Sequence, residues 1–419
     1  MTFSLTAPVV TDRPTLKSVK PSAGKAVKMA PATPAPLTAK TTSTSVGAKA
    51  PPPPTEGALD ETDIGLARRV FRVRRDLNDT TECEVIDATL WALGGYAAIW
   101  VDGDVPIDQY RNCDDVEACE EDESCFEESD YDAHGFDNCD LQTIVNIVDT
   151  NIMPNVTALL GDPSDEDDND RVSIVISPVL NAISLTSDDE DDWETLVEAY
   201  TDPDTDLDDF SAEENPCSDE QEVIYVYAPD PYGYYNPHAT VTVDEYTGMD
   251  LAGRIVQGMV GLISYNQHVL VNESDAEESW VTKGIAAVVA DMVGFGAIYY
   301  DDAWDYMDAP HLNSLTDGQE EDAECGEGDT GSAEGGGGEG PPDEGGGGPP
   351  PSKSGEEGDN VISTDKRGAQ YLFFRWLVDT YGTDILAELV QTDQTGLCNI
   401  EAATEEELKD LAVAWQVAL

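Results

Sequence analysis

The chain has 419 residues, 40% of them hydrophobic, which is enough for one large domain or two and excludes a wholly disordered protein. Its 87 Asp and Glu residues far outnumber its 21 Lys and Arg residues, so the formal net charge is −66. This charge repels nucleic acids and anionic lipids and makes both poor partners, so no nucleic-acid partner is expected, whereas it attracts divalent cations and basic proteins. It is equally typical of a solvated shell that keeps a protein soluble in high salt. No stretch has the ~18–20 apolar residues of a membrane-spanning helix.

The first 62 residues are rich in Pro, Ala and Lys and contain few large apolar side chains, which predicts a disordered tether. They begin with "MTFSLTAPVV", which lacks the charged start and the apolar run of a signal peptide. We therefore expect one folded domain over residues 63–419, and this domain carries nearly all of the acidic charge.

Eight cysteines, an even number with several in acidic segments, favour disulfides and an oxidising compartment. A zinc knuckle is the alternative for the group from Cys113 to Cys139, but that group has no C-x-x-C pair. Disulfides without a signal peptide leave two interpretations: the export signal lies outside this sequence, or the cysteines are reduced. We expect the first. The cysteines are Cys83, Cys113, Cys119, Cys125, Cys139, Cys217, Cys325 and Cys398.

The N-terminal part of the domain contains patterns of both strands and helices. "ATLWALGGYAAIWVD" (Ala88–Asp102) is apolar and aromatic and predicts one or two strands. An acidic, cysteine-rich insertion follows at residues 112–139. Residues Leu141–Gly161 then have apolar side chains at helical spacing, and Pro154 predicts a break in that helix.

An acidic stretch, "SDEDDNDRVSI", comes next and resembles the start of a calcium-binding loop. Asp165, Asp167 and Asn169 have the D-x-D-x-N spacing of the first half of an EF-hand loop. The usual Gly is replaced by Asp170, and the twelfth position is Ile176 instead of Glu, which excludes a complete EF-hand. We expect either a smaller calcium site at the first three residues or a solvated acidic loop.

Two more strands are predicted after this loop. "RVSIVIS" (Arg171–Ser177) and "EVIYVYAP" (Glu222–Pro229) are rich in β-branched and aromatic residues and have the length of strands. A second acidic insertion, residues 186–220, separates them.

The rest of the chain has mainly helical patterns. "RIVQGMVGLISYNQ" (Arg254–Gln267) predicts an apolar helix that ends in a polar turn, and Glu278–Gly296 predicts another. Residues 315–362 are Gly-, Pro- and acid-rich and predict a disordered loop. Three helices follow: "GAQYLFFRWLVDTYG", "DILAELVQ" and "EELKDLAVAWQVAL". The last has one apolar face, formed by Leu408, Leu411, Ala412 and Trp415. The fold class is therefore α+β, with the sheet in the N-terminal part and a mainly helical C-terminal part.

The order of several short segments resembles a known family. The segments are "MPNVTALLG" (Met153–Gly161), "YVYAPDPYG" (Tyr225–Gly233), "LISYNQHVLVN" (Leu262–Asn272), "ESWVTKG" (Glu278–Gly284) and "AQYLFFRWLVDTYG" (Ala369–Gly382). Together they resemble secreted zinc metallopeptidases of the hyicolysin type, which are gluzincins related to thermolysin. The resemblance covers most of the folded region and implies a zincin-like metallopeptidase fold.

The resemblance also implies where the active site of such a peptidase would lie. Members of the family have H-E-x-x-H before a turn like "SYNQ", followed later by a Glu that completes the zinc ligands. Two His one helical turn apart bind Zn²⁺, and the Glu beside the first His activates the bound water. In this chain Gln257 and Gly261 stand at the two His positions, Gly258 at the general base and Lys283 at the third ligand. The resemblance therefore implies a degenerate member that binds no zinc.

No other histidine is placed to restore such a site. The chain has only four, and His268, eleven residues after Gln257, would lie roughly 16 Å away along a helix. A different metal site built on His238 or His311 with carboxylates stays an alternative. A second alternative is that the helix is simply a buried core helix that never carried a metal. The fourth histidine is His134.

Taken together, these patterns predict a catalytically inactive metallopeptidase homologue outside the cytoplasm. We expect it to bind a protein or peptide, or to serve as a surface or scaffold component. The first alternative is an active zinc endopeptidase with an atypical metal site, and the second is a calcium-stabilised structural or adhesive module. No cofactor other than Ca²⁺ is predicted, and the oligomeric state stays open.

Overall fold

The computed structural model describes the chain from residue 59 onward, with gaps. The chain divides into two units, Met1–Pro52 and Pro53–Leu419, and all described residues belong to the second. The predicted tether up to residue 58, nearly all of the loop at 315–362 and most of the insertion at 112–139 lie outside the described residues. Those described are 59–77, 83–108, 136–167, 169–183, 185, 196–207, 217–308, 310, 315–316 and 364–418.

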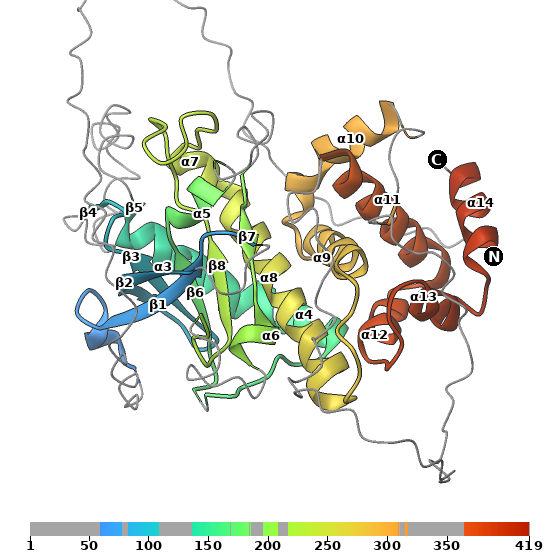
Figure 1. The fold of residues 1–419 in the computed structure, drawn as a ribbon, viewed down its shortest axis with the longest axis horizontal. Coiled ribbons are helices and arrows are strands. Elements are labelled where there is room, and N and C mark those ends of the chain that lie inside the picture. The colour runs from blue at the N-terminus through green and yellow to red at the C-terminus, as the bar shows by residue number, and fades with distance from the viewer. Residues whose placement is uncertain are drawn as a thin grey trace, which may run out of the picture. The chain divides into compact units, whose positions relative to one another are not determined.

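A curled six-stranded sheet occupies the N-terminal part (Figure 1). Its order is β1-β2-β3-β6-β8-β7; β1, β2 and β3 are antiparallel, β3, β6 and β8 are parallel, and β7 pairs antiparallel to β8 at the edge. The strands are β1 (Arg68–Arg74), β2 (Cys83–Leu93), β3 (Ala97–Asp102), β6 (Val172–Ile176), β7 (Ala199–Tyr200) and β8 (Val223–Val226). Two further strands, β4 (Ile107–Asp108) and β5 (Phe136–Asp137), pair with each other. The strands predicted from residues 88–102, 171–177 and 222–229 are confirmed.

The buried strands explain why the alternation of apolar and polar residues is weak in this sheet. Every residue of β3, β6 and β8 is buried, because helices cover the parallel part of the sheet.

β7 was not predicted, since its two residues lie in the range taken for an acidic insertion. The same range holds the short helix α6 (Pro203–Asp206).

The residues after β5 form one continuous helical segment, although Pro154 predicted a break into two helices. It consists of α3 (Asn138–Ile147), a π-helical turn η4 (Val148–Ile152) and α4 (Met153–Leu160). The predicted break at Pro154 is therefore only a local widening of the helix. Pro154 is the second residue of α4, and α4 directly follows the π-helical turn, whose wider hydrogen-bonding pattern accommodates the missing N–H.

Helix α8 (Leu251–Tyr265) forms the centre of the domain, between the sheet and the C-terminal helices (Figure 1). A π-helical turn, η7 (Tyr246–Asp250), leads into it from the short helix α7 (Val243–Glu245), and another, η8 (Asn266–Val271), follows it. The prediction of a polar turn at "SYNQ" was thus wrong, because the chain stays helical to Val271. The polar side chains there make tertiary contacts: Asn266 Nδ2 donates to the carbonyl oxygen of Asp162 at 2.9 Å.

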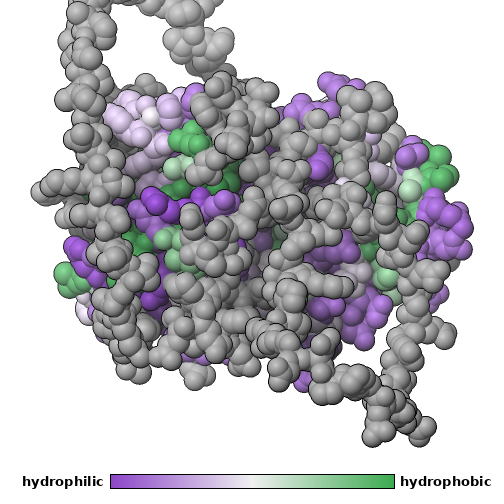
Figure 2. Space-filling view, in the orientation of Figure 1, coloured by the Kyte–Doolittle hydropathy of each residue, from purple (hydrophilic) through white to green (hydrophobic). Residues whose placement is uncertain are grey.

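The C-terminal part is helical, as predicted. The predicted helix at 278–296 is α9 (Ser279–Val293), and Gly294 ends it in the left-handed conformation. On the last helix, Leu411 and Trp415 are buried, whereas Val413 and Val417 are exposed. Figure 2 shows hydrophobic atoms in green where this helix lies in Figure 1. The other helices are α5 (Val179–Ile183), before α8 in the chain, and then α10 (Tyr300–Asp308), α11 (Thr364–Tyr381), α12 (Asp384–Val390), α13 (Gly396–Thr404) and α14 (Leu408–Ala418). No helix among the described residues is long and apolar enough to span a membrane.

One of the predicted disulfides joins distant parts of the sheet. Cys83, the first residue of β2, is bonded to Cys217, which lies shortly before β8, with a Cα–Cα distance of 5.7 Å. Cys398 is also disulfide-bonded. The cysteines for which a zinc knuckle was the alternative lie outside the residues whose side chains are described.

Candidate functional site

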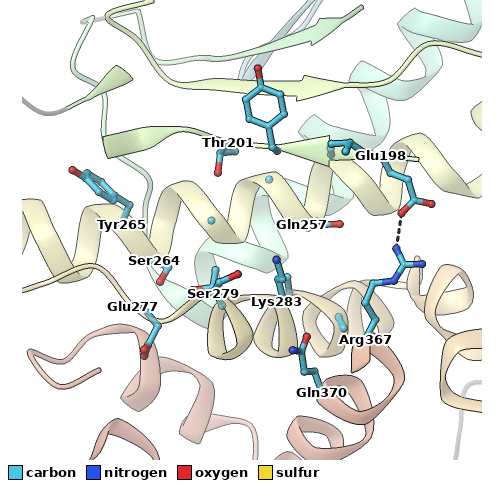
Figure 3. Close-up of a pocket in the computed structure, with 18 of the residues that line it drawn as sticks. Glu198, Thr201, Gln257, Ser264, Tyr265, Glu277, Ser279, Lys283, Arg367 and Gln370 are labelled. Carbon is cyan, nitrogen blue, oxygen red and sulfur yellow. Dashed lines mark hydrogen bonds and ion pairs between the residues drawn. The ribbon is translucent and has the colours of Figure 1, made fainter. Parts of the chain in front are cut away.

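A cavity of about 350 Å³ lies between α8, α9, α11 and the segment that contains β7 (Figure 3). Gln257, Gly258 and Gly261 line it from α8, and Lys283 lines it from α9. The structure therefore brings together all four positions that the resemblance identified as counterparts of zinc-peptidase residues. In Figure 3, Lys283 points from α9 toward α8.

The four positions offer no ligand that zinc prefers. Gln257 accepts a hydrogen bond through its Oε1 from Arg254 Nη1 at 3.3 Å, and the two glycines have no side chain. Lys283 brings an ammonium group, which has donors but no lone pair to share with a metal ion. Zinc sites use Cys, His and carboxylate ligands, so this arrangement cannot hold zinc in the usual way.

Close packing leaves no room for a side chain at the general-base position. A Cβ atom added to Gly258 would lie 2.5 Å from Ile224 Cγ2 on β8. At Gly261 the nearest neighbour of such an atom would be the hydroxyl oxygen of Thr201, at 2.8 Å, which belongs to a side chain that can rotate. The helix therefore packs tightly against the sheet at Gly258, where a carboxylate side chain would be needed for catalysis.

The outer edge of β7 faces the cavity. Tyr227 N donates to Glu198 O at 3.1 Å, and the antiparallel register continues through Ala199↔Val226 and Tyr200↔Tyr225. Because hydrogen-bonded pairs alternate along an antiparallel ladder, the N–H and C=O of Ala199 point away from β8. Among the described residues, no strand pairs with this side of β7, and residues 196–201 line the cavity.

A buried ionic network closes one end of the cavity. The Glu198 carboxylate of the β7 segment lies 2.6 Å from Arg254 Nη2 of α8 and 2.7 Å from Arg367 Nη1 of α11. Burial alone would raise the pKa of Glu198, but the two guanidinium groups outweigh it and lower that pKa below its ordinary value. Arg367 Nε also lies 3.0 Å from Asp302, whose pKa burial raises to about 6. The network thus joins four elements: the β7 segment, α8, α11 and the helix that carries Asp302.

Two buried polar side chains in the cavity wall have unused hydrogen-bonding capacity. Gln370 is 1% exposed and Ser264 is 3% exposed, and both line the cavity. Neither the amide nitrogen nor the amide oxygen of Gln370, nor the Ser264 hydroxyl, has a hydrogen-bond partner among the described residues. Buried polar groups are nearly always paired, so these atoms indicate a ligand or water in the cavity.

A buried carboxyl group, Glu277, lies at the other end of the cavity. Its Oε1 accepts from Gly396 N at 2.6 Å and its Oε2 accepts from Asn399 Nδ2 at 2.5 Å. Burial nevertheless raises the pKa of Glu277 to about 7. His268 Nε2 lies 3.8 Å from Glu277 Oε2, but burial lowers the pKa of His268, so the two groups do not form an ion pair at neutral pH.

The described histidines do not form a metal site in the cavity. His268 is fully buried, donates from its Nε2 to the carbonyl oxygen of Leu389 (3.3 Å), and does not line the cavity. His238 is exposed and lies after the tyrosine-rich loop beyond β8. His134 and His311 lie outside the described residues.

The structure places the three predicted calcium residues side by side. Carboxylate oxygens of Asp165 and Asp167 lie near each other, and a third carboxylate, that of Glu222, joins them. Asn169 lies beside them: its Nδ2 donates to Asp167 Oδ2 at 2.5 Å, and its Oδ1 accepts from Arg171 N at 2.6 Å. A signal for Glu222 was available, since acidic residues precede both parallel strands β6 and β8.

Sequence reasoning also missed Glu198, Arg254, Arg367 and Gln370. The signal for Arg254 was its place in an otherwise apolar helix, where a charge needs a partner. No such signal marks the others, because their positions depend on how β7 and α11 pack against α8.

Known proteins give no further guide to this site. No model of a known protein family matches the chain, and no curated protein matches it either. The resemblance to hyicolysin-type peptidases therefore stays a prediction.

The packing of α8 predicts different effects of the same substitution at two glycines. Gly258→Ala should lower the free energy of unfolding by about 1–2 kcal/mol, because overpacking against Ile224 exceeds the gain in helix propensity. Gly261→Ala should change it by less than about 0.5 kcal/mol, because Thr201 can rotate away. Urea unfolding of both variants measures the difference, and equal effects would contradict the packing described for α8.

The raised pKa of Glu277 predicts a dependence of stability on pH. The folded state binds this proton more tightly than the unfolded state, whose Glu titrates near 4.5, so its contribution is complete below pH 4.5 and lost as the pH rises through 7. Relative to Glu277→Gln, the wild type should lose about 3 kcal/mol of unfolding free energy between pH 4.5 and 8. Urea unfolding across this range measures it.

The exposed Asp275 supplies the matched control, since Asp275→Asn removes one charge nearby without touching the buried site. A pH dependence that is the same in the wild type and in Glu277→Gln would show that Glu277 is not the titrating group.

Proposed function

We propose that this protein is a catalytically inactive relative of hyicolysin-type zinc metallopeptidases, with a zincin-like fold, and that it binds an extended peptide outside the cytoplasm. The single observation that carries the proposal is that the four altered positions line one cavity, alongside an edge strand with an open side. The binding of a peptide segment is compatible with a role as a surface or scaffold component.

The loss of catalysis is supported by the charges and the packing in the cavity. Lys283 places a cation where a zinc ligand would stand, and this cation would repel a metal ion. Gly258 cannot be replaced by a general base without displacing Ile224. Within the described residues, the one group of three metal-ligating side chains is the Asp165 cluster, which does not line the cavity.

Peptide binding is supported by the hydrogen-bonding groups that face the cavity. An extended chain can add to a sheet edge through its own N–H and C=O groups, and Ala199 offers both of these groups on the open side of β7. The carboxamide of Gln370 likewise offers one unused donor and one unused acceptor, as a peptide group requires. A peptide would therefore satisfy groups on both walls of the cavity.

A location outside the cytoplasm is supported by the disulfide chemistry. The Cys83–Cys217 bond and the bonded Cys398 are typical of an oxidising compartment, because cytosolic proteins seldom keep structural disulfides.

Zinc content and hydrolysis distinguish this proposal from an active peptidase with an atypical site. The purified full chain, dialysed without chelator in high salt, should contain less than about 0.1 zinc per molecule and should not hydrolyse casein. Elemental analysis and a casein assay with and without 1,10-phenanthroline measure both. Stoichiometric zinc together with chelator-sensitive hydrolysis would overturn the inactive assignment.

Replacement of one backbone donor tests the peptide proposal. A random dodecapeptide library, displayed on phage and selected in high salt, should yield peptides that bind the wild type. Ala199→Pro should weaken the binding of a synthesised hit at least about tenfold, because proline removes the outward N–H at no cost to the β7–β8 ladder. Fluorescence anisotropy measures the affinity.

Ala199→Val is the matched control, since it keeps the N–H and suits a strand, and it should bind as the wild type does unless its side chain enters the peptide site. Hits whose affinity is the same for Ala199→Pro and for the wild type, with both proteins folded, would contradict binding at this edge.

A further inference from the structure

The structure assigns a second binding site, and we propose that Asp165, Asp167 and Glu222 together hold one calcium ion. This site is separate from the cavity and does not depend on the proposed function. It differs from the calcium site expected from the sequence, in which Asn169 would have been the third ligand.

The three carboxylates come from two segments that the sheet places side by side. Asp165 and Asp167 lie in the loop before β6, and Glu222 directly precedes β8. β6 and β8 are neighbouring parallel strands, with Ser173 paired to Val223, and Ser173 N donates to Glu222 O at 2.9 Å. One carboxylate oxygen from each of the three residues lies within 4.8 Å of the other two. Oxygens that share one Ca²⁺ at 2.3–2.6 Å can be at most about 5.2 Å apart, so the spacing fits.

Glu222 gives an independent reason to expect an ion. The residue is 1% exposed, yet its Oε2 has no hydrogen-bond partner among the described residues. Its Oε1 accepts one bond, from Glu166 N at 2.9 Å. In the described part of the chain, neither Glu222 nor Asp165 pairs with an arginine or lysine. A buried carboxylate beside other carboxylates, without a cation, is strongly unfavourable. A bound cation removes that cost.

The loop around Asp165 is already arranged for binding. Asp165 Oδ1 accepts hydrogen bonds from Asn169 N and Asp170 N, both at 2.9 Å, and Asp170 adopts the left-handed conformation with φ of 59°. These bonds orient the Asp165 carboxylate and leave its other oxygen for a ligand.

The donor set points to calcium in preference to other metals. It consists of carboxylate oxygens only, without His or Cys, which favours a hard cation over zinc or copper. Calcium accepts irregular oxygen cages completed by water, whereas magnesium requires near-octahedral geometry at 2.0–2.1 Å. A bound ion would tie the loop before β6 to β8, and β8 carries the edge strand β7.

The test is calcium binding by the full chain after treatment with EDTA and removal of the chelator. In high KCl, which screens the general acidic surface, calorimetry should detect one site, and Ca²⁺ should raise Tm by several degrees. Mg²⁺ at the same concentration should raise it by less than half as much. Glu222→Gln should weaken binding at least about tenfold and remove most of the shift.

Two further variants keep the test decisive. Asp165→Asn retains an oxygen for the loop hydrogen bonds and should also lose the calcium shift, which settles the matter if Glu222→Gln does not fold. Glu166→Gln removes a charge from the same loop outside the cluster and should bind calcium as the wild type does. A calcium response that is the same in Asp165→Asn as in the wild type would overturn the proposal, as would the absence of any response in the wild type.

Discussion

The pairing of Glu198 with two arginines is the interaction on which the cavity depends. Arg254 comes from the central helix α8 and Arg367 from α11, so the three side chains hold the β7 segment against both helices. Arg254 is 4% exposed, and Glu198 and Arg367 are each 24% exposed. Removal of Glu198 would leave the buried Arg254 charge without its ion-pair partner, a loss that typically costs about 3–5 kcal/mol. The network ties β7, which already pairs with β8, to the two helices that form the facing walls of the cavity.

Ion pairs with arginines also hold other parts of the acidic segment that contains β7. Asp202 pairs with Arg74 and Asp219 pairs with Arg72, two arginines on the strand β1. The disulfide between Cys83 and Cys217 adds a covalent tie to the next strand, β2. A chain with a net charge of −66 therefore uses several of its 21 basic residues to anchor one acidic segment. By composition this segment is an acidic insertion, but in the structure it forms part of the cavity wall.

The helices and buried strands were predictable because their side chains repeat with the period of the element. The resemblance to hyicolysin-type peptidases, through "SYNQ" and "SWVTKG", also implied that Gln257 and Lys283 face each other, and both residues line one cavity. β7 was not predictable, because two residues in an acidic segment carry no period and are held by partners distant in sequence. Acidic residues before both β6 and β8 were a signal for Glu222, but Glu222 joins its cluster through the pairing of these two strands, and no local pattern specifies that strand order. The sequence thus predicted what depends on local periodicity, and missed what depends on strand order and ion pairs.

The central claim is that the cavity between α8 and α9, where a related peptidase would hold zinc, binds a peptide and no metal ion. Crystals of the full chain, grown with zinc and a selected peptide, would test it through anomalous diffraction at the zinc absorption edge. The account predicts no anomalous peak between Gln257 and Lys283, and an extended peptide that pairs with the open side of β7. A zinc peak bound by cavity residues, with no peptide along β7, would contradict it.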